Sequence, residues 1–469
     1  MEEIKKEHLN VAIIGHVDAG KSTLTGHLLF ELGGLDERTL DRLKEEAKAL
    51  GKDSFSFAFF MDNKKAERER GITIDCNTKE FNTSKYHYSI IDTPGHKDFI
   101  KNMISGASQA DVAVLMVPAN RGGFETSIAK GDHKKNVITG QTRQHAQLAY
   151  LLGIEQIVVC VNKMDNKSVK YDKKRYDEIA KEVTKMLRSF GYRSKSKDSK
   201  LERFPVIPLS GWSGDNLTTK SDKMPWYTGF KYEYDGKVLE GHTLLDAMDT
   251  VQPLDRRVEA PFRMPVSAVF KIPGVGDVIT GKIEQGMLKA GQEVVFSPSG
   301  LTGKIFSIEM HHRTVDQATP GYNIGVNVKG LGKTKLEKPK TGEVMHYKSD
   351  PTVTEKVTRF QAMVLVQAHP GHLKCAGKDG KGGFTPVLHV RTAKVPCRMV
   401  SIDFKKGKST SGAKVDSPPF VEAGDQAVVW FEPHKPLYVE KFEDCPGLGR
   451  IAVMESNSLV MLGKILNVE

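Results

Sequence analysis

Eight residues near the N-terminus combine two glycines, a lysine and a serine at a spacing that suits phosphate binding. The stretch Gly15–Ser22 reads Gly-His-Val-Asp-Ala-Gly-Lys-Ser, which fits the pattern of glycine, four residues, then Gly-Lys-Ser. Glycines let the backbone approach phosphate oxygens, lysine neutralises the β- and γ-phosphates, and the serine hydroxyl is a ligand for Mg²⁺. We therefore expect a nucleotide phosphate site made by the following residues: Gly15, His16, Val17, Asp18, Ala19, Gly20, Lys21, Ser22 and Thr23.

The residues on either side of this stretch predict a turn between a strand and a helix. Val11–Ile14 is a short apolar run of the kind found in a buried parallel strand. Leu24, Leu28 and Leu29 then share one face of a helix. Such a turn directs backbone N–H groups and a helix N-terminus at an anion. The alternative, a chance match in a tight turn, is disfavoured by this strand and helix context.

Two further stretches supply groups for a metal ion and a third phosphate. Asp92–Gly95 (Asp-Thr-Pro-Gly) follows an apolar run, and we expect Asp92 to hold Mg²⁺ through water while the Gly95 N–H senses the γ-phosphate. Thr73, in the preceding polar segment, is placed to join Ser22 and Asp92 as a metal ligand. Contacts of this kind order a loop in one nucleotide state and release it in the other.

Another pair of stretches predicts the base of the nucleotide. Asn162–Asp165 (Asn-Lys-Met-Asp) follows the apolar run Ile157–Val161, and the Asp165 carboxylate can accept from the two donors on the guanine edge. Adenine offers no such pair, and leaving a carboxylate unpaired gives roughly 10⁴-fold discrimination or more. Ser210–Trp212 follows the run Val206–Leu209 and completes the expected base site. The base-site residues are Asn162, Lys163, Asp165, Ser210, Gly211 and Trp212, and the expected ligands are GTP and GDP.

Short apolar runs alternate with helical patterns from residue 11 to about residue 250. The clearest helix is Arg175–Phe190, which carries Tyr176, Ile179 and Val183 on one face and is followed by Gly191. This alternation predicts an α/β P-loop GTPase domain with a doubly wound, mostly parallel sheet.

The pattern changes after the linker region at residues 251–261, where short strands separated by glycines predict β-barrels. A polar, lysine-rich stretch, Lys329–Asp350, separates two such strand-rich regions. We therefore expect a GTP-binding domain over residues 1–252, a β-barrel over residues 253–353 and a second β-barrel over residues 354–469.

The composition of the chain indicates where the protein acts in the cell and which class of partner it can bind. The chain has 469 residues and no apolar run near the roughly 18 residues of a membrane helix, and its N-terminus lacks a secretory signal. The 5 cysteines are widely spaced, which predicts reduced thiols in the cytoplasm rather than disulfides or a zinc site. The net charge of +11 suits a polyanion such as RNA. We expect no membrane partner.

Taken together, these stretches resemble the translation elongation factor 1 alpha family over essentially the whole chain. Gly274–Gly276 and Ser307–His312 match in the expected second domain, and His369–Gly371 and Gly447–Arg450 match in the third. The stretch Gly131–Lys135 is longer than in standard members and resembles the divergent elongation factor-like paralogues.

The resemblance implies GTP-dependent delivery of aminoacyl-tRNA to the ribosomal A site, with hydrolysis triggered by the ribosome. It implies that His96 positions the attacking water and that Val17 and Ile72 form an apolar gate. The alternative for His96 is a helix cap. No arginine finger is evident in the chain, so we expect slow intrinsic hydrolysis and activation by a partner.

The resemblance also names residues for the tRNA and further partners. Glu309, His311 and Asn323 match the region that takes the aminoacyl-adenosine end, although each is equally compatible with a polar surface position on a barrel strand. A guanine-nucleotide exchange factor is an implied partner, actin is a second candidate partner, and we expect a monomer.

Three rival functions remain open from the sequence. The first is a termination or ribosome-rescue GTPase, which usually has a long N-terminal extension, whereas this chain starts shortly before its first strand. The second is a metabolic GTPase subunit, as in sulfate activation, which the match in the third domain disfavours. The third is a cytoskeletal or scaffold role that needs no GTP.

Overall fold

The computed structural model describes residues 6–62, 64–130, 140–194, 199, 201–253, 256–310, 313–332, 334, 337–353, 357–367, 371–377, 382–407, 410–455 and 458–469. The chain divides into two compact units, Met1–Leu254 and Asp255–Glu469, and each is described by itself. The expected insertion at Gly131–Lys135, His311 and the dipeptide His369-Pro370 lie outside the described residues. Among the helices that the structure describes, none has the length and apolar character required to cross a membrane.

The first unit is built on a six-stranded sheet with the order β2-β3-β1-β4-β5-β6. The pairs from β3 to β6 are parallel, and only β2 runs antiparallel, at one edge. Every residue of β4 and β5 is buried, which agrees with the apolar runs Val112–Val117 and Ile157–Val161 within them. The strands are β1 (Glu7–Gly15), β2 (Asn77–Asn82), β3 (Tyr86–Asp92), β4 (Val112–Pro118), β5 (Gln156–Asn162) and β6 (Val206–Pro208).

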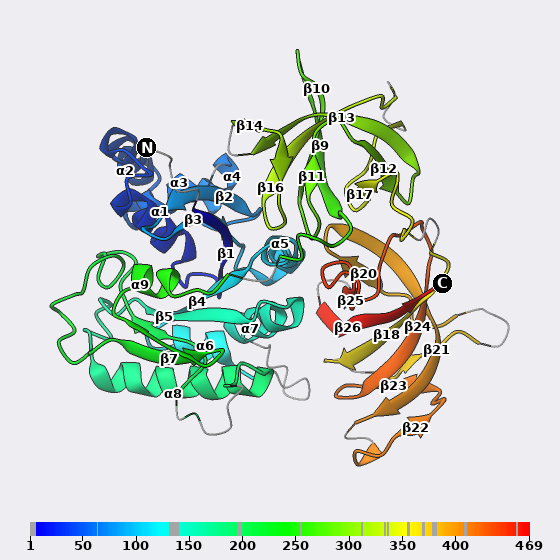
Figure 1. Cartoon of the computed structure of the whole chain (residues 1–469). Helices are drawn as coiled ribbons and strands as arrows, with labels where there is room; N and C mark the ends of the chain where they lie inside the picture. The colour runs from blue at the N-terminus through cyan, green and yellow to red at the C-terminus, as the bar shows by residue number, and fades with distance from the viewer. Residues whose placement is uncertain are drawn as a thin grey trace. The chain divides into compact units, whose positions relative to one another are not determined.

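Helices cover both faces of this sheet (Figure 1), which confirms the doubly wound α/β fold. On one face α5 (Ile100–Ala107), α7 (Gln141–Leu152) and α8 (Lys173–Phe190) pack side by side. On the other face lie α1 (Lys21–Glu31) and α9 (Leu244–Asp249). This division follows from right-handed crossovers in a sheet whose strand order reverses at β1.

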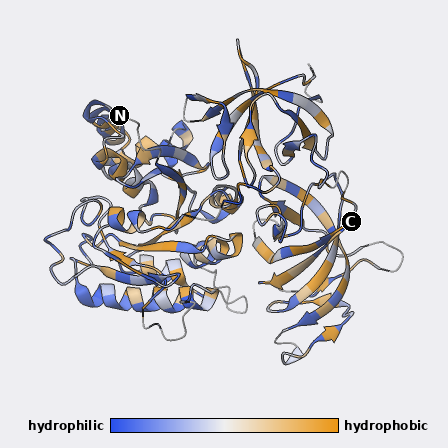
Figure 2. Ribbon diagram, viewed as in Figure 1, coloured by the Kyte–Doolittle hydropathy of each residue, from blue (hydrophilic) through white to orange (hydrophobic). Residues whose placement is uncertain are grey.

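The predicted helix at Arg175–Phe190 is confirmed as α8 and begins two residues earlier. The Asp172 carboxylate accepts the N–H groups of Lys174 and Arg175, and Gly191 ends the helix at a φ of 118°. Figure 2 shows the central strands as mainly hydrophobic and α8 as largely hydrophilic. The apolar face of α8 therefore packs on the sheet while its charged face meets water.

Several short elements of the first unit were not predicted. Between α1 and β2 the chain forms α2 (Glu37–Ala49), a 3₁₀ turn (Asp53–Phe55), α3 (Ser56–Met61) and α4 (Lys65–Arg70). Others are the edge strand β2, α6 (Gly123–Ile128) and the hairpin of β7 (Phe230–Tyr234) and β8 (Lys237–Gly241). A small core of Leu43, Ala47 and Phe59 holds α2 and α3 together. The helices α2, α3 and α4, which precede Thr73, place it at the nucleotide site.

The second unit contains two β-barrels, as expected. In the first barrel the order is β12-β17-β9-β10-β16-β13, and the pairing of β12 with β13 closes the ring. Its strands are β9 (Met264–Ile272), β10 (Gly276–Lys282), β12 (Glu293–Ser297), β13 (Leu301–Met310), β16 (Asn323–Lys329) and β17 (Val344–Tyr347), with β14 (Arg313–Val315) at the edge and the pair β11 (Leu288–Lys289) and β15 (Gln317–Ala318) beside it. The lysine-rich stretch Lys329–Asp350 is more than a separator, because it contains β17.

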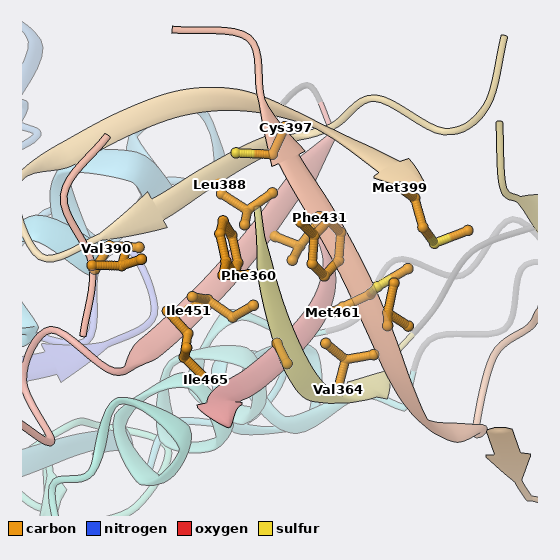
Figure 3. Close-up of a cluster of buried hydrophobic side chains, with 14 of the residues drawn as sticks. Phe360, Val364, Leu388, Val390, Cys397, Met399, Phe431, Ile451, Met461 and Ile465 are labelled. Atoms are coloured by element: carbon orange, nitrogen blue, oxygen red, sulfur yellow. The ribbon is translucent and has the colours of Figure 1, made fainter. Parts of the chain in front are cut away.

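The second barrel is closed in the same way by the pairing of β20 with β21. The rings of Phe360 and Phe431 lie 5.7 Å apart in its core, among the side chains of Figure 3. Its strands are β18 (Phe360–Val366), β20 (Val387–Val390), β21 (Ala393–Lys406), β24 (Gln426–Pro433), β25 (Arg450–Glu455) and β26 (Ser458–Val468), with β22 (Val415–Asp416) at the edge and the pair β19 (Leu373–Lys374) and β23 (Phe420–Val421) beside it.

A buried arginine links the first barrel to the segments that follow it. Arg263 is 1% exposed, and its guanidinium pairs with the carboxylates of Asp350 and Glu440 and donates to the Thr352 hydroxyl. Buried charges are tolerated only when they are paired. The pKa of Arg263 is raised by Tyr438 and Glu440 against the effect of burial, so it remains a cation that fixes these segments.

Candidate nucleotide-binding site

A cavity of about 550 Å³ opens at the carboxyl ends of the strands in the first unit. Its volume lies within the range of about 300–1,000 Å³ that is typical of small-molecule sites. The predicted residues that line it are Val17, Asp18, Gly20, Lys21, Ser22, Thr23, Ile72, Thr73, Gly95, His96, Asn162, Lys163, Asp165 and Trp212. The other predicted site residues of this unit do not line the cavity themselves: Gly15, His16, Ala19, Asp92, Ser210 and Gly211.

The glycine cradle has the geometry that its sequence predicts. Gly20 has a φ of 87° and precedes the first residue of α1, and a Cβ atom there would lie 2.5 Å from the Asn162 side-chain amide. The Lys21 ammonium donates to the His16 carbonyl at 2.9 Å. Burial lowers the pKa of Lys21 to about 8, although Asp92 and Asp18 act in the opposite direction. A phosphate placed beside this lysine would stabilise its charge further.

Three side chains of α7 hold the backbone at the start of the cradle. The N–H groups of Gly15, His16 and Val17 donate to His145 Nδ1 at 3.2 Å, Thr142 Oγ1 at 3.2 Å and Gln141 Oε1 at 3.3 Å, respectively. Burial lowers the pKa of His145 to about 3, so its imidazole is neutral and can accept. This support was not predicted from the sequence. The sequence pattern that could have revealed it is the set of polar residues Gln141, Thr142 and His145 at the start of a helix that otherwise packs on the sheet.

Gly15 therefore has a different surrounding from the one expected. Its N–H group is used by His145, and a Cβ atom on it would lie 2.5 Å from the Met116 carbonyl oxygen of β4. A side chain at Gly15 is therefore excluded by close packing against β4. Gly20 and Gly95, in contrast, line the cavity.

The predicted base site is joined directly to the cradle. The Asn162 amide donates to the Ala19 carbonyl at 2.8 Å, and its Oδ1 accepts the Gly211 N–H at 2.8 Å. The Ser210 hydroxyl donates to Asp165 Oδ1 at 2.7 Å. The structure thus brings both ends of the expected nucleotide site together, with Asn162 positioning the loops and Asp165 lining the cavity.

Aromatic side chains border the base end of the cavity. Trp212 is 45% exposed, and its ring meets Phe57 of α3 edge-on at 6.1 Å. Phe57 in turn stacks on His27 of α1 at 4.3 Å. These contacts hold α3 beside the base site, which the sequence did not predict.

The three predicted metal ligands lie at the opposite end. The hydroxyls of Ser22 and Thr73 are 3.0 Å apart. Asp92 is completely buried, and neither of its carboxylate oxygens has a hydrogen-bond partner among the described residues. Burial raises the pKa of Asp92 to about 6, although Ser22 and Lys21 act to lower it.

This donor set suits a hard divalent cation. Hydroxyl and carboxylate oxygens are the ligands that Mg²⁺ prefers, and it is usually held by a few protein oxygens together with water and phosphate. Asp62 adds a second buried carboxylate, which accepts from the Thr73 hydroxyl at 3.2 Å. Burial raises the pKa of Asp62 to about 7, and Asp92 and Glu67 act in the same direction. Asp62 was not predicted from the sequence as a site residue.

The sequence left two roles open for His96, namely positioning of the attacking water and capping of a helix. Its side chain lines the cavity with Val17 and Ile72. Its Nδ1 also accepts the Asp98 N–H at 3.3 Å, so it caps the 3₁₀ turn Lys97–Phe99.

The predicted tRNA residues lie on the first barrel. Glu309 of β13 is paired with Gly325 of β16, and Asn323 lies two residues along β16 on the same face. Glu309 is exposed and Asn323 is half-buried. His311, the third of these residues, lies outside the described part of the chain.

Comparison with known proteins identifies the family. The model of the elongation factor Tu GTP binding domain matches residues 6–254, that of elongation factor Tu domain 2 matches residues 276–346, and that of the GTP-eEF1A C-terminal domain-like family matches residues 359–466. Elongation factor 1-alpha of Aeropyrum pernix is 44% identical over 99% of this chain and 98% of its own length. The chain belongs to the elongation factor 1-alpha family. The protein of the same name from Saccharomyces cerevisiae is 43% identical over 99% of this chain and 95% of its own length.

Solved structures agree with the fold of this chain. The Saccharomyces cerevisiae Ski7 GTPase-like domain, bound to GTP, has a TM-score of 0.70 at 18% identity and covers 98% of this chain and 97% of its own. The bacterial selenocysteine-specific elongation factor EF-Sec has a TM-score of 0.61 at 19% identity and covers 98% of this chain and 58% of its own. Membership of the elongation factor 1-alpha family makes the protein a GTP-binding GTPase of translation elongation and confirms the resemblance read from the sequence.

Proposed function

We propose that the protein binds GTP with Mg²⁺ and, in that state, delivers aminoacyl-tRNA to the ribosomal A site. The observation that carries the proposal is the Asn162 side chain, which bonds to both Ala19 and Gly211. One residue thereby joins the phosphate cradle to the base site, as a guanine-nucleotide switch requires. Membership of the elongation factor 1-alpha family supplies the task to which such a switch is put.

Ser22, Thr73 and Asp92 would hold the Mg²⁺. The metal supplies charge neutralisation at the β- and γ-phosphates when it is bound. Thr73 reaches the site from a segment far along the chain, so its presence there depends on the fold of that segment. Loss of the third phosphate removes a contact that holds the segment, which is how hydrolysis ends the tRNA-binding state.

His96, Val17 and Ile72 form the proposed catalytic group. His96 would orient water, while the two aliphatic side chains exclude water until the ribosome repositions them. Phosphoryl transfer is catalysed mainly by positioning and charge stabilisation, so one orienting side chain is sufficient. The location of all three residues in one cavity supports this assignment.

The aminoacyl end of the tRNA would meet the face of the first barrel that carries Glu309 and Asn323, with His311 as the third residue. Carboxylate and amide groups on one face can hydrogen-bond to ribose and base edges. The net charge of +11 favours the rest of the tRNA electrostatically.

The wider setting is part of the same proposal. We assign a GTP-binding domain to residues 1–252 and β-barrel domains to residues 253–353 and 354–469. The protein would act in the cytoplasm as a monomer, with a guanine-nucleotide exchange factor as partner. Actin is a second candidate partner, and salt-sensitive filament binding that is indifferent to nucleotide would support it.

Protection of the aminoacyl ester tests the proposal. Purified protein is mixed with charged tRNA in GTP or in GDP, and deacylation is followed with time. We expect slow deacylation with GTP and unprotected deacylation with GDP. Equal rates in the two nucleotides would refute the proposed tRNA-binding state.

A further inference from the structure

The backbone directly after Thr73 is held by two side chains that the proposed mechanism does not use. Glu67 Oε1 accepts the N–H groups of Ile74 at 2.9 Å and Asp75 at 3.1 Å. From the other side, the Asn102 amide donates to the Ile74 carbonyl at 2.9 Å. We refer to Glu67 and Asn102 as the Ile74 clamp.

Glu67 is an unusual residue for such a position. It lies in α4 and is completely buried, and its second oxygen accepts the Lys64 N–H at 3.2 Å. Burying a carboxylate is costly unless it is satisfied, and hydrogen bonds to a charged acceptor are about twice as strong as neutral ones. Three backbone donors therefore make Glu67 a firm attachment point between α4 and the residues after Thr73.

Asn102 brings in a different part of the nucleotide site. It lies in α5, the helix that follows Gly95 and His96, and its amide also donates to the Asp75 carboxylate at 3.2 Å. The Asn102 carbonyl accepts from the Cys76 thiol at 3.1 Å. The segment that carries Thr73 is thus bonded to the helix that follows the segment carrying His96.

Further contacts hold the other side of Thr73. The Lys52 ammonium donates to the carbonyls of Arg68 at 3.0 Å and Glu69 at 2.7 Å, at the C-terminal end of α4. Cations at a helix C-terminus satisfy its last carbonyls. The chain is therefore held before and after Thr73, and the Thr73 hydroxyl meets Ser22 between these two points.

We propose that Glu67 and Asn102 are positioning residues that set Thr73 at the metal end of the site, and that Asn102 couples this segment to the one that carries His96. The inference rests on the proposed role of Thr73 in the GTP state. Without the clamp, the contact of Thr73 that distinguishes GTP from GDP would be lost, while the cradle and the base site would remain.

The test compares dissociation constants for GDP and for a non-hydrolysable GTP analogue at fixed Mg²⁺. We expect Glu67→Ala and Asn102→Ala to weaken the analogue by roughly 5-fold or more, which corresponds to the loss of one net hydrogen bond, and to change GDP by less than 2-fold. Asn102→Asp removes the amide donor at nearly constant volume and should behave like Asn102→Ala. If Glu67→Ala does not fold, Asn102→Asp is the variant that tests whether the Ile74 clamp positions Thr73.

Glu125→Ala is the control for loss of a glutamate at the start of a helix. Glu125 accepts the Gly122 N–H at 2.7 Å at the start of α6, as Glu67 accepts the Lys64 N–H, but it is exposed, pairs with Arg175 at 2.8 Å and lies away from the cavity. It should leave the ratio of the two affinities unchanged. Hydrogen exchange of residues 68–76 in the analogue-bound state gives a second readout, and we expect faster exchange in the clamp variants than in the control.

Thr73→Ala separates the inference from the proposal on which it rests. If Thr73→Ala leaves the ratio of affinities unchanged, the proposed role of Thr73 fails. If Thr73→Ala changes the ratio but the clamp variants weaken both nucleotides equally or neither, the clamp has a merely structural role and the inference is overturned.

Discussion

The hydroxyls of Ser22 and Thr73 lie 3.0 Å apart although 51 residues separate them in the chain. Ser22 belongs to the first turn of α1, and Thr73 follows α4. The two hydroxyls come from separate segments, and together with the buried carboxylate of Asp92 they are the proposed ligands of Mg²⁺. In this proposal, their meeting point links the nucleotide state to the conformation of the chain between them.

Ser22→Ala should remove much of the Mg²⁺ dependence of nucleotide binding, because the proposed ligand is lost while the cradle backbone remains. We expect the GDP affinity of the wild-type protein to fall when Mg²⁺ is chelated. The fall in GDP affinity should be about 10-fold smaller in the variant. Equilibrium titration with and without a chelator measures this. Ser54→Ala is the control, since Ser54 lines the same cavity; an equal response of Ser22→Ala and wild type would contradict the metal assignment.

Asp165→Asn should change the base that the protein selects. The carboxylate accepts two donors on guanine, whereas an amide offers a donor that suits a purine with an oxygen at position 2, as in xanthine. The Ser210 hydroxyl, which donates to Asp165 Oδ1 at 2.7 Å, can donate to the amide oxygen too. We expect the affinity for guanosine nucleotides to fall by roughly 10⁴-fold. Xanthosine nucleotides should bind more tightly to the variant than to the wild-type protein, as measured by competition. Asp18→Asn, at the phosphate end, should keep the preference for guanine.

His96→Ala should lower ribosome-stimulated GTP hydrolysis by roughly 10²- to 10⁴-fold while GTP affinity changes little. His96→Asn distinguishes a catalytic role of His96 from a capping role, because asparagine is a good N-cap but lacks the imidazole. Single-turnover hydrolysis on ribosomes provides the measurement. Full activity of His96→Asn would leave His96 as no more than the cap of the 3₁₀ turn.

His145 predicts a dependence of stability on pH. Its pKa is lowered to about 3 in the folded protein, against about 6.5 in an unfolded chain. The unfolded state therefore binds the proton first, and folding is penalised as pH falls below about 6.5, by up to ~1.4 kcal/mol per pH unit until the pH nears 3. Above pH 6.5 the residue contributes no pH dependence.

The measurement compares unfolding free energies of wild type and His145→Gln between pH 5 and pH 8. Glutamine keeps an acceptor for the Gly15 N–H group but does not titrate in this range. Asp62 and Asp92 have raised pKa values and favour the folded state as pH falls, but both proteins contain them, so their effect cancels in the difference. Parallel stability curves for the two proteins would show that His145 does not carry this penalty.

The sequence predicted those parts of the site whose signal is local. Gly15–Ser22, Asp92–Gly95 and Asn162–Asp165 each begin at the last residue of a buried strand, and parallel strands bring their carboxyl ends to one edge. Knowing the strands was therefore sufficient to bring these stretches together. The closed barrels followed in the same way from short strands separated by glycines.

The parts that were missed depend on contacts distant in sequence or on a weak pattern. His145 accepts the N–H of Gly15 across 130 residues, and no periodicity reveals a contact so distant in sequence. Glu67 appears in the sequence as one charge among several in α4, and only the fold shows that it is buried. Val344–Tyr347 is a strand of four residues within a lysine-rich stretch, which is too short to show alternation.

Peptide-bond formation on the ribosome tests the central claim most directly. Ribosomes from Saccharomyces cerevisiae, the source of a relative 43% identical to this chain, carry an initiator tRNA and a defined second codon, and the purified protein is the sole elongation factor. The account predicts rapid dipeptide formation with GTP and the cognate aminoacyl-tRNA, with about one GTP hydrolysed per dipeptide, and none with GDP. GTP hydrolysis without any gain in dipeptide would contradict it.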